Sequence, residues 1–366
     1  MSKKLKILIS GGGTGGHIFP ALSIADELKK RNPHAEILFV GADNRMEMER
    51  VPAAGYKIIG LPVRGLIRRF TFENIRVVLD FLKSRRMAKK IVRDFQPNAA
   101  VGVGGYASAP LLNAASKLGV PYLLQEQNSY AGVTNKMLSK KAGKICVAYE
   151  NMQRYFPADK LLNTGNPVRE IKIESNLKED AKKHFGIESN NPVLFIMGGS
   201  LGARTINQAL LAGIETLANK PIEVIWQTGK YYFEDIKKEV SPKNYTNIRV
   251  MDFVSRMDLA YNAADLVVSR AGALSLSELC LVGKPSLLVP SPNVAEDHQT
   301  KNAQALVSAG ASEMVRDVDA KNSLIDSALA LLDNKEQLSK LGANAKKLAK
   351  PDATATIVDE VLKLVK

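Results

Sequence analysis

Residues 7–17 read ILISGGGTGGH and residues 193–204 read VLFIMGGSLGAR, and these two stretches decide the fold. In each, a short apolar run precedes a cluster of glycines and then a segment with helical spacing. Glycine lets the backbone approach a ligand closely, and the following helix offers unpaired N–H groups and the positive end of its dipole. Two such phosphate-binding turns, each opening a separate α/β half, indicate two domains that hold a phosphorylated ligand in a cleft.

Both halves are predicted to alternate strands and helices. Continuous apolar strands linked by helices are typical of parallel sheets covered on both faces. The expected strands are 5–10, 35–41, 56–61, 98–103, 121–125, 144–148, 193–198, 222–228, 247–250, 265–269 and 285–289. The expected helices are 17–31, 71–95, 107–118, 132–141, 177–185, 203–218, 255–263, 274–282, 297–309, 321–333 and 335–349. We therefore expect an N-terminal domain over 1–166, a C-terminal domain over 167–352, and a final helix over 353–366 that packs back on the first domain.

The composition indicates a soluble protein with an anionic partner. Hydrophobic content is 45% and charged content 24%, and no apolar window reaches the roughly 20 residues of a spanning helix. The net charge of +14 is unusual. Residues 64–93 alone hold ten basic residues against two acidic ones. Such a charge suits an acidic lipid surface, a phosphorylated substrate or a nucleic acid. The basic stretch lacks the interleaved aromatic residues of a nucleic-acid binder, and we expect no nucleic acid as partner.

The basic stretch also carries apolar residues at helical spacing. A helix over 71–95 would place an apolar strip on one face with basic residues at its edge, and an arginine-rich loop precedes it. This pattern suits the anionic cytoplasmic leaflet of a membrane. Alternatively, the strip packs on the sheet and only the charges face outward. The residues predicted to meet the membrane are Leu66, Ile67, Arg68, Arg69, Phe70, Ile75, Leu79, Leu82, Arg85 and Arg86.

The first glycine loop alone permits three interpretations. Gly11, Gly13 and Gly16 match the spacing of a dinucleotide-binding loop, and Asp43 could bind the ribose of a nicotinamide cofactor. However, His17 directly follows the loop, where its ring would face the cleft, and hydride transfer has no evident use for it. His17 could also be a helix-start residue bonded to the backbone.

Polar residues follow further strands of the first half. Tyr106, Asn128 and Asn135 are candidates to contact sugar hydroxyls, and Glu126 is a possible second acid or base. The alternative is that they are turn residues bonded to their own backbone.

The second half contains a more specific motif, SRAGALSLSE at 269–278. A strand is expected to end at Ser269 and a helix to begin near Leu274, where free N–H groups could bind an anion. Glu278 could accept two hydrogen bonds from a ribose diol. A capping box formed by Ser275 and Glu278 is the competing interpretation.

Five motifs together resemble a known family over essentially the whole chain. They are GGTGGH at 12–17, EQN at 126–128, GNPVR at 165–169, GGSLGA at 198–203 and the motif at 269–278, in family order. They resemble the bacterial N-acetylglucosaminyltransferases that convert lipid I into lipid II for peptidoglycan. The resemblance implies a GT-B fold, in which two Rossmann-like, doubly wound parallel-sheet domains face a central cleft. It also implies inverting transfer from UDP-N-acetylglucosamine to the 4-hydroxyl of undecaprenyl-diphospho-N-acetylmuramoyl-pentapeptide.

The resemblance further implies roles for individual residues. His17 is the favoured base, the Val254 backbone reads the uracil, and Gln299 contacts the donor sugar. The remaining donor-binding positions are Thr14, Gly15, Gly16, Asn128, Arg169, Ser200, Ala273, Leu274, Ser275, Leu276, Ser277 and Glu278.

The chain departs from the family pattern at three positions. Gln125 stands where histidine is common, which leaves His17 and Glu126 as candidate bases. Ser275 stands where threonine is common in the family, and Leu201 replaces a polar residue. A rival interpretation is another GT-B enzyme, such as those that glycosylate diacylglycerol or natural products. Those enzymes lack the Glu-Gln-Asn triplet that stands here at 126–128.

Three further expectations concern cofactors, partners and location. We expect no cofactor and no essential metal, and the expectation about the metal rests on the interpretation that the chain has no Asp-x-Asp triplet. The resemblance implies a peripheral protein on the cytoplasmic face of the plasma (inner) membrane. Its partners would be the two substrates, the anionic membrane surface and other proteins of cell-wall synthesis.

Overall fold

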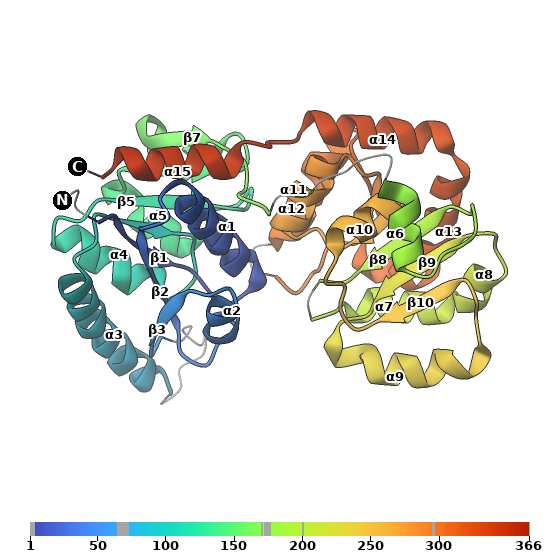
Figure 1. Ribbon diagram of the computed structural model, residues 1–366, viewed down its shortest axis with the longest axis horizontal. Coiled ribbons are helices and arrows are strands. Elements are labelled where there is room, and N and C mark those ends of the chain that lie inside the picture. Colours follow the sequence, from blue (N-terminus) through green and yellow to red (C-terminus); the bar gives the residue numbers. More distant parts are fainter. Residues whose placement is uncertain are drawn as a thin grey trace. The chain divides into compact units, whose positions relative to one another are not determined.

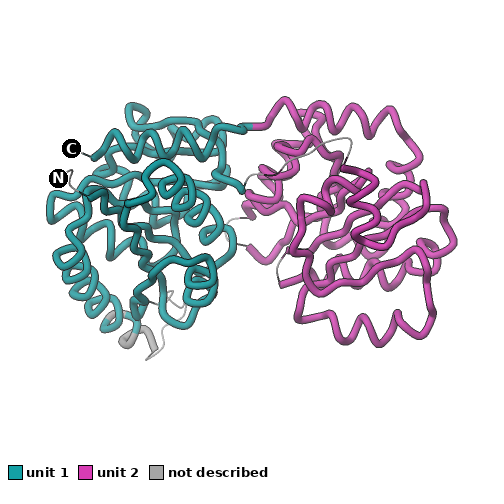
Figure 2. Tube along the Cα trace, viewed as in Figure 1, with its two compact units in different colours: residues 1–169, 350–366 teal, residues 170–349 magenta. Residues whose placement is uncertain are grey.

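The computed structural model describes residues 4–63, 73–169, 171, 177–199, 201–294 and 297–365, with the backbone alone for 73–76 and 78. The chain forms two compact units (Figure 2). Unit 1 comprises residues 1–169 and 350–366, and unit 2 comprises residues 170–349.

Unit 1 is a seven-stranded parallel sheet with the strand order β3-β2-β1-β4-β5-β6-β7 (Figure 1). Its strands are β1 (Lys6–Ser10), β2 (Glu36–Ala42), β3 (Lys57–Leu61), β4 (Ala99–Gly102), β5 (Tyr122–Glu126), β6 (Lys144–Val147) and β7 (Leu161–Asn163). Its helices are α1 (Gly15–Arg31), α2 (Glu47–Ala53), α3 (Glu73–Phe95), α4 (Ser108–Lys117), α5 (Val133–Leu138) and α15 (Ala353–Lys363). Short 3-10 turns occur at η1 (Ser139–Lys141), η2 (Met152–Arg154) and η3 (Ala158–Lys160).

Alternation along each strand builds a core on both faces of this sheet. In β1, Ile7 and Ile9 belong to the cluster with α1, whereas Leu8 belongs to the opposite cluster with α3 and α4. Successive side chains of a strand point to opposite faces, so a strand that is apolar at every position must be covered on both.

The C-terminal helix α15 completes unit 1. It packs against α1, and Ile357, Val358 and Val361 are fully buried in the α1 cluster. An ion pair between Arg31 and Asp359, 2.5 Å long, joins the two helices at the surface.

Unit 2 is a six-stranded parallel sheet with the order β10-β9-β8-β11-β12-β13. Its strands are β8 (Val193–Met197), β9 (Glu223–Gln227), β10 (Ile248–Met251), β11 (Leu266–Ser269), β12 (Ser286–Leu288) and β13 (Glu313–Met314). Its helices are α6 (Lys178–His184), α7 (Arg204–Ala212), α8 (Ile214–Ala218), α9 (Lys230–Val240), α10 (Met257–Ala263), α11 (Ala273–Val282), α12 (His298–Ser308), α13 (Ala320–Asp333) and α14 (Lys335–Lys347). Two 3-10 turns are η5 (Ser241–Lys243) and η7 (Asp317–Asp319).

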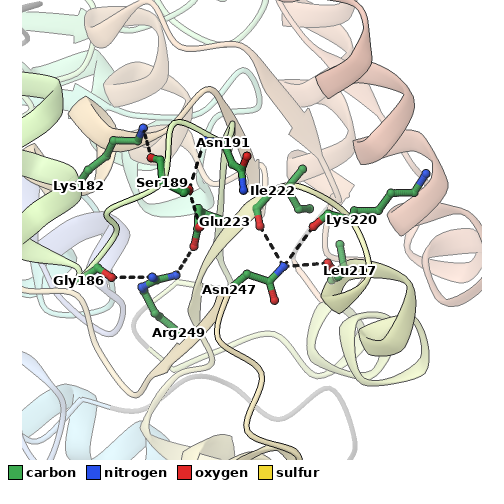
Figure 3. Close-up of polar contacts among 10 residues, drawn as sticks. All are labelled: Lys182, Gly186, Ser189, Asn191, Leu217, Lys220, Ile222, Glu223, Asn247 and Arg249. Carbon is green, nitrogen blue, oxygen red and sulfur yellow. Dashed lines mark hydrogen bonds and ion pairs between the residues drawn. The ribbon is translucent and has the colours of Figure 1, made fainter.

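The amino edge of this second sheet is tied together by polar side chains (Figure 3). Glu223 accepts hydrogen bonds from Arg249, at 2.5 Å, and from Ser189, at 2.6 Å. Asn247 Nδ2 donates to the carbonyl oxygens of residues 217, 220 and 222. These polar groups are therefore engaged within the protein. Ligands of doubly wound sheets bind at the opposite edge, where the carboxyl ends of the strands lie.

The two parallel sheets predicted from the sequence are confirmed, and every expected strand is present within a few residues. Among the described residues, the helices and strands that were not foreseen are α2, β7, α9 and β13, and the 3-10 turns η2, η3, η5 and η7 were not foreseen either. The helix expected over 203–218 is interrupted at Gly213, which separates α7 from α8. Among the residues that the structure describes, no helix is long and apolar enough to cross a membrane.

Candidate active site

The predicted site residues gather at the carboxyl edges of the two sheets, mostly around the switch points. In unit 1 the chain turns in opposite directions after β1 and β4, and in unit 2 after β8 and β11. Ligands of doubly wound sheets bind outside the carboxyl ends of the strands at such points. Both glycine loops therefore lie where the topology opens a binding crevice.

The first glycine loop is packed against its neighbours at backbone distance. A Cβ on Gly11 would lie 2.0 Å from Val103 Cγ2, and a Cβ on Gly105 would lie 2.5 Å from the Gly12 carbonyl oxygen. The loops that follow β1 and β4 thus approach so closely that neither position accepts a side chain. Gly15 and Gly16 form the first turn of α1, with Thr14 as its N-cap.

His17 stands at the start of α1 with its ring on the β4 loop. Its Nδ1 lies 3.3 Å from Thr14 Oγ1, and a Cβ on Gly104 would lie 2.8 Å from the ring atoms Cδ2 and Nε2. Gly104 adopts φ +98, which also favours glycine at this position. The ring is half-buried at the carboxyl edge of the sheet.

Glu47, a residue that the sequence analysis missed, holds the first glycine loop from behind. It is fully buried at the start of α2. Its carboxylate accepts hydrogen bonds from the backbone N–H groups of Gly13 and Ala42, both 2.9 Å long. Nothing in the run RMEMER distinguishes Glu47 from Glu49, because only the packing of α2 shows which carboxylate turns inward.

Glu126 is the centre of a second loop. The carboxylate is 3% exposed and accepts hydrogen bonds from Gly132 N, Asn135 Nδ2 and Asn128 N, of 2.9, 2.9 and 3.2 Å. Burial raises the pKa of the Glu126 carboxyl, while these donors oppose the shift. Asn135 is itself buried, and its Oδ1 has no hydrogen-bond partner among the described residues. This network fixes the 126–135 loop and places Glu126 and Asn135 behind the surface.

A buried amide network surrounds Gln125, which stands where the family often has histidine. Gln125 Nε2 donates to Asn166 Oδ1, at 3.0 Å, and Asn166 Nδ2 donates to the carbonyl oxygen of Gln127, at 3.1 Å. Gln127 Nε2 in turn donates to the carbonyl oxygen of Val103, at 2.8 Å. These side chains connect the ends of β4 and β5 to the segment that leads toward Arg169.

The second glycine loop packs against the end of β9. A Cβ on Gly202 would lie 2.1 Å from the Thr228 carbonyl oxygen, and Gly202 adopts φ +84. Gln227, also missed from the sequence, holds this loop. Its Nε2 donates to the Gly199 carbonyl oxygen, at 3.0 Å, and its Oε1 accepts from Val254 N, at 3.1 Å. The sequence signal for Gln227 was its polar side chain at the end of β9, a buried strand.

The motif at 269–278 forms a free helix start. Helix α11 begins at Ala273, its N-cap is Gly272, and none of the side chains that the structure describes caps it. The capping-box interpretation is therefore wrong, because Ser275 lies inside the helix rather than at its N-cap. Glu278 accepts a hydrogen bond from the Tyr261 hydroxyl, at 2.9 Å.

Several predicted binding residues have buried side chains in unit 2. Leu276 and Val254 belong to its core cluster and Ala273 is buried, so only their backbones could meet a ligand. Leu274, Ser275 and Ser277 are partly exposed, and Ser277 Oγ donates to the Ala273 carbonyl oxygen at 2.9 Å. Gln299 Oε1 accepts from Ser291 N, at 2.9 Å, and so holds the loop after β12.

An Asp-x-Asp triplet occurs at 317–319, so the expectation that the chain has none is wrong. Asp317 pairs with Arg270, at 2.5 Å, and accepts from Thr205 Oγ1, at 3.0 Å. Asp319 pairs with Arg316, at 2.7 Å. Both carboxylates are thus engaged by protein groups, and Asp317 links Arg270, just before α11, to Thr205 at the start of α7.

The remaining predictions divide between exposed and undescribed residues. Tyr106 and Arg169 are exposed and Asn128 is partly exposed at the carboxyl edge of unit 1. Ser200 lies outside the described residues. The structure brings Thr14 to Gly16 together with His17, and Glu126 with Asn128 and Asn135.

The surface of α3 carries the predicted membrane residues. Leu79 is 59% and Leu82 45% exposed, so the alternative interpretation, in which these two pack on the sheet, is wrong. The buried face of α3 consists instead of Val77, Ser84, Ala88, Ile91 and Val92. Leu66, Ile67, Arg68, Arg69 and Phe70 lie outside the described residues, as does the side chain of Ile75.

A groove of about 290 Å³ runs between α3 and α4 on this surface. Its cations are Arg85, Arg86, Lys89 and Lys117, and Leu82, Pro110 and Ala114 supply its apolar part. Phe81, 42% exposed, adds an apolar group that the sequence analysis missed.

Two family models match the chain. Residues 7–147 match the glycosyltransferase family 28 N-terminal domain, and residues 193–357 match the glycosyltransferase family 28 C-terminal domain. Both glycine loops fall within the matched ranges.

The chain is similar to proteins named UDP-N-acetylglucosamine--N-acetylmuramyl-(pentapeptide) pyrophosphoryl-undecaprenol N-acetylglucosamine transferase. The protein of this name from Parabacteroides distasonis is 55% identical, over 99% of both chains. That from Cytophaga hutchinsonii is 53% identical, over 99% of this chain and 98% of its own. The crystal structure of MurG from Acinetobacter baumannii has a TM-score of 0.77 at 28% identity, over 98% of this chain and 99% of its own.

A solved structure with lower identity shows the fold alone. The glycosyltransferase of kitacinnamycin reaches a TM-score of 0.71 at 13% identity, over the whole of both chains. With the matches above, this makes the fold GT-B. The chain belongs to glycosyltransferase family 28, within the group of these N-acetylglucosamine transferases.

Proposed function

We propose that this chain transfers N-acetylglucosamine from UDP-N-acetylglucosamine to the 4-hydroxyl of the N-acetylmuramoyl group in lipid I, with inversion, and so forms lipid II for peptidoglycan. The observation that carries this proposal is the 55% identity to a transferase of that name over 99% of both chains. The loops at the switch points of both sheets support it, because they supply the groups that the reaction needs.

The donor is assigned to unit 2. The first turn of α11 offers uncapped N–H groups for a diphosphate, and Glu278 lies one turn further for the ribose. Because the Val254 N–H is bonded to Gln227, the group of Val254 left for the uracil imide is its carbonyl oxygen. Gln299 would contact the sugar through the part of its amide that does not hold Ser291.

His17 is assigned as the base that removes the acceptor proton. Imidazole titrates nearest to neutral pH, and a positioned base contributes roughly 10²–10⁴-fold. The ring is partly exposed and oriented by Thr14. Glu126, in contrast, is buried and saturated by backbone and amide donors, which supports a role in shaping the loop that carries Asn128.

The departing diphosphate needs fixed donors. The helix starts after Gly202 and Gly272 present N–H groups, and Arg169 and Ser200 are assigned to add a cation and a hydroxyl. Preorganised donors aimed at developing charge are commonly the largest contribution to catalysis. Unit 1 then contributes Arg169 and the base, with Thr14, Gly15 and Gly16 shaping the loop of the base, and unit 2 contributes the other leaving-group donors.

The lipid-linked acceptor requires a membrane surface, which we assign to α3. Exposed apolar side chains on α3 beside the groove cations suit an anionic leaflet, at about 1 kcal/mol per Lys or Arg near the surface. The chain would then act as a peripheral protein on the cytoplasmic face of the plasma membrane, where other proteins of cell-wall synthesis are its expected neighbours.

The enzymatic proposal is tested with radiolabelled UDP-N-acetylglucosamine and a lipid I analogue, followed by linkage analysis of the product. We expect a β-1,4-linked disaccharide and release of UDP. Failure to label the analogue, or a retained anomeric configuration, would refute the proposal.

The membrane proposal is tested by sedimentation with vesicles that contain anionic phospholipid. The variant R85E/R86E should lose binding that the wild type shows, whereas K335E/K340E, with the same charge change on exposed residues of α14, should retain it. Equal binding by all three proteins would assign the membrane contact elsewhere.

A further inference from the structure

The carboxylate of Glu47 joins two loops of unit 1 that the sequence separates widely. Oε2 accepts from Gly13 N in the loop after β1, and Oε1 accepts from Ala42 N at the end of β2. Glu47 is fully buried, and it forms no ion pair within the part of the chain that the structure describes. Its two oxygens are therefore devoted to backbone N–H groups.

The same side chain explains two of the glycines. A Cβ on Gly12 would lie 2.0 Å from Glu47 Oε1, and a Cβ on Gly41 would lie 2.5 Å from Glu47 Cγ. No L-residue with a side chain fits at either position while Glu47 keeps its place. Gly12 is thus required by a neighbouring carboxylate, whatever ligand the loop binds.

The tether lies close in sequence to His17. Gly13, whose N–H is held, adopts φ +88, and the next residue, Thr14, is the N-cap of α1. The His17 N–H donates to the Thr14 carbonyl oxygen, at 3.1 Å, and the ring meets Thr14 Oγ1. A rotation of the peptide before Gly13 would therefore move Thr14 and, with it, the imidazole.

We propose that Glu47 is a positioning residue that sets the first glycine loop so that His17 faces the acceptor hydroxyl, an inference that rests on the proposed function. A carboxylate suits this role because it accepts at both oxygens and donates at neither. The amide of glutamine would keep one acceptor and turn its NH₂ group toward a backbone N–H. Glu47→Gln therefore removes one tether with little change in volume.

The kinetic test compares Glu47→Gln with Val51→Ala. Val51 is buried in the same short helix but does not touch the glycine loop through a hydrogen bond. We expect Glu47→Gln to lower kcat by roughly 10-fold or more, with the KM for UDP-N-acetylglucosamine within about twofold of wild type. Val51→Ala should lower Tm at least as much and leave kcat near that of wild type. If the loss of kcat is proportional to the loss of Tm in both variants, Glu47 has only a structural role and the inference is overturned.

A double-mutant cycle tests the steric part. Gly12→Ala should lower Tm strongly in the wild-type background and much less in Glu47→Ala, where the space for a methyl group has been opened. Additive shifts would contradict a direct contact between the two positions.

The His17 ring supplies a readout that needs no activity. Its imidazole NMR signals, assigned with His17→Gln, should shift in Glu47→Gln and stay in place in Val51→Ala. If the wild type fails to transfer sugar, the proposed function fails while this measurement still judges the tether. Unshifted signals in Glu47→Gln would overturn the inference even in an active enzyme.

Discussion

In unit 1 the glycine loop lies against a buried carboxylate, Glu47, whereas in unit 2 the corresponding loop lies against the neutral amide of Gln227. Glu47 accepts an N–H of its loop, and Gln227 donates to a carbonyl of its loop. In unit 1 the Gly13 N–H is therefore not available to a ligand, and a negative charge lies behind the loop. In unit 2 the bond to Gln227 engages the Gly199 carbonyl oxygen and adds no charge.

This difference assigns different ligands to loops that look alike in sequence. A diphosphate needs free N–H groups, which the start of α11 offers, and it is disfavoured by a carboxylate bonded directly to the loop, as Glu47 is in unit 1. Unit 1 adds a second buried carboxylate, Glu126, at the same edge. In unit 2, Arg270 directly follows β11, and its charge is paired with that of Asp317. The comparison predicts that changes in unit 1 act mainly on turnover and changes in unit 2 on donor binding.

The largest effect should come from His17→Ala. If unit 1 supplies the base, kcat should fall by roughly 10²–10⁴-fold while the KM for UDP-N-acetylglucosamine stays within about twofold. Steady-state kinetics with the lipid I analogue measure both constants. His34→Ala, an exposed histidine of the same unit, is the control and should behave as wild type. Equal losses in kcat and in donor affinity would recast His17 as a binding residue.

Gly202→Ala should have the next largest effect, on unit 2. The added methyl would meet the Thr228 carbonyl at a φ that disfavours alanine, and the loop must shift. We expect UDP to bind at least about 30-fold more weakly by calorimetry, equivalent to about 2 kcal/mol. Gly186→Ala carries the same left-handed φ in open space and should keep UDP affinity. Matching losses in both variants would attribute the effect to backbone strain alone.

Gln227→Glu should weaken UDP binding by roughly 10-fold. The carboxylate still accepts from Val254 N but no longer donates to the Gly199 carbonyl, and it brings into unit 2 the charge that unit 1 carries. Titration of UDP at several salt concentrations measures the loss and its electrostatic share. Gln337→Glu, which changes an amide at the start of α14, is the control. An unaltered affinity would show that the contrast between the loops does not select the ligand.

The smallest effect concerns the pH dependence of stability. Burial raises the pKa of the Glu126 carboxyl in the folded state. The folded protein therefore binds this proton more tightly than the unfolded chain does, and this contribution lowers stability as pH rises from about 4.5 through the folded pKa. Glu126→Gln cannot ionise and should lose stability less steeply over that window. Urea unfolding of both proteins across the window tests this, and parallel curves would exclude the effect.

Periodicity and glycine placement predicted most of the fold. The apolar runs of β1 and β8 and the glycines after them are local signals, and local signals survive in any tertiary context. Three of the unforeseen helices and strands lacked such signals, whereas α9, whose buried Ile236 and Val240 lie four residues apart, was overlooked. β13 has two residues, β7 has three, and α2 contains Pro52 within a single short helix. The Asp-x-Asp triplet was visible in the sequence and was overlooked.

The residues of the candidate site likewise divide into those with local sequence signals and those without. His17, Glu126 and the motif at 269–278 follow strands or glycines, so sequence reasoning could propose them. Glu47, Gln227 and Asp317 act through contacts with loops distant in sequence, and nothing near them in the chain predicts those contacts.

The sequence by itself determined that two parallel sheets would form and that each would end in a glycine loop, because apolar runs and glycines impose those structures locally. Only the tertiary structure decided what stands behind each loop. Folding brings a carboxylate to Gly13 and an amide to Gly199. Since hydrogen bonding and charge act over a few ångströms of space, the difference between the loops appears only when distant residues are packed together.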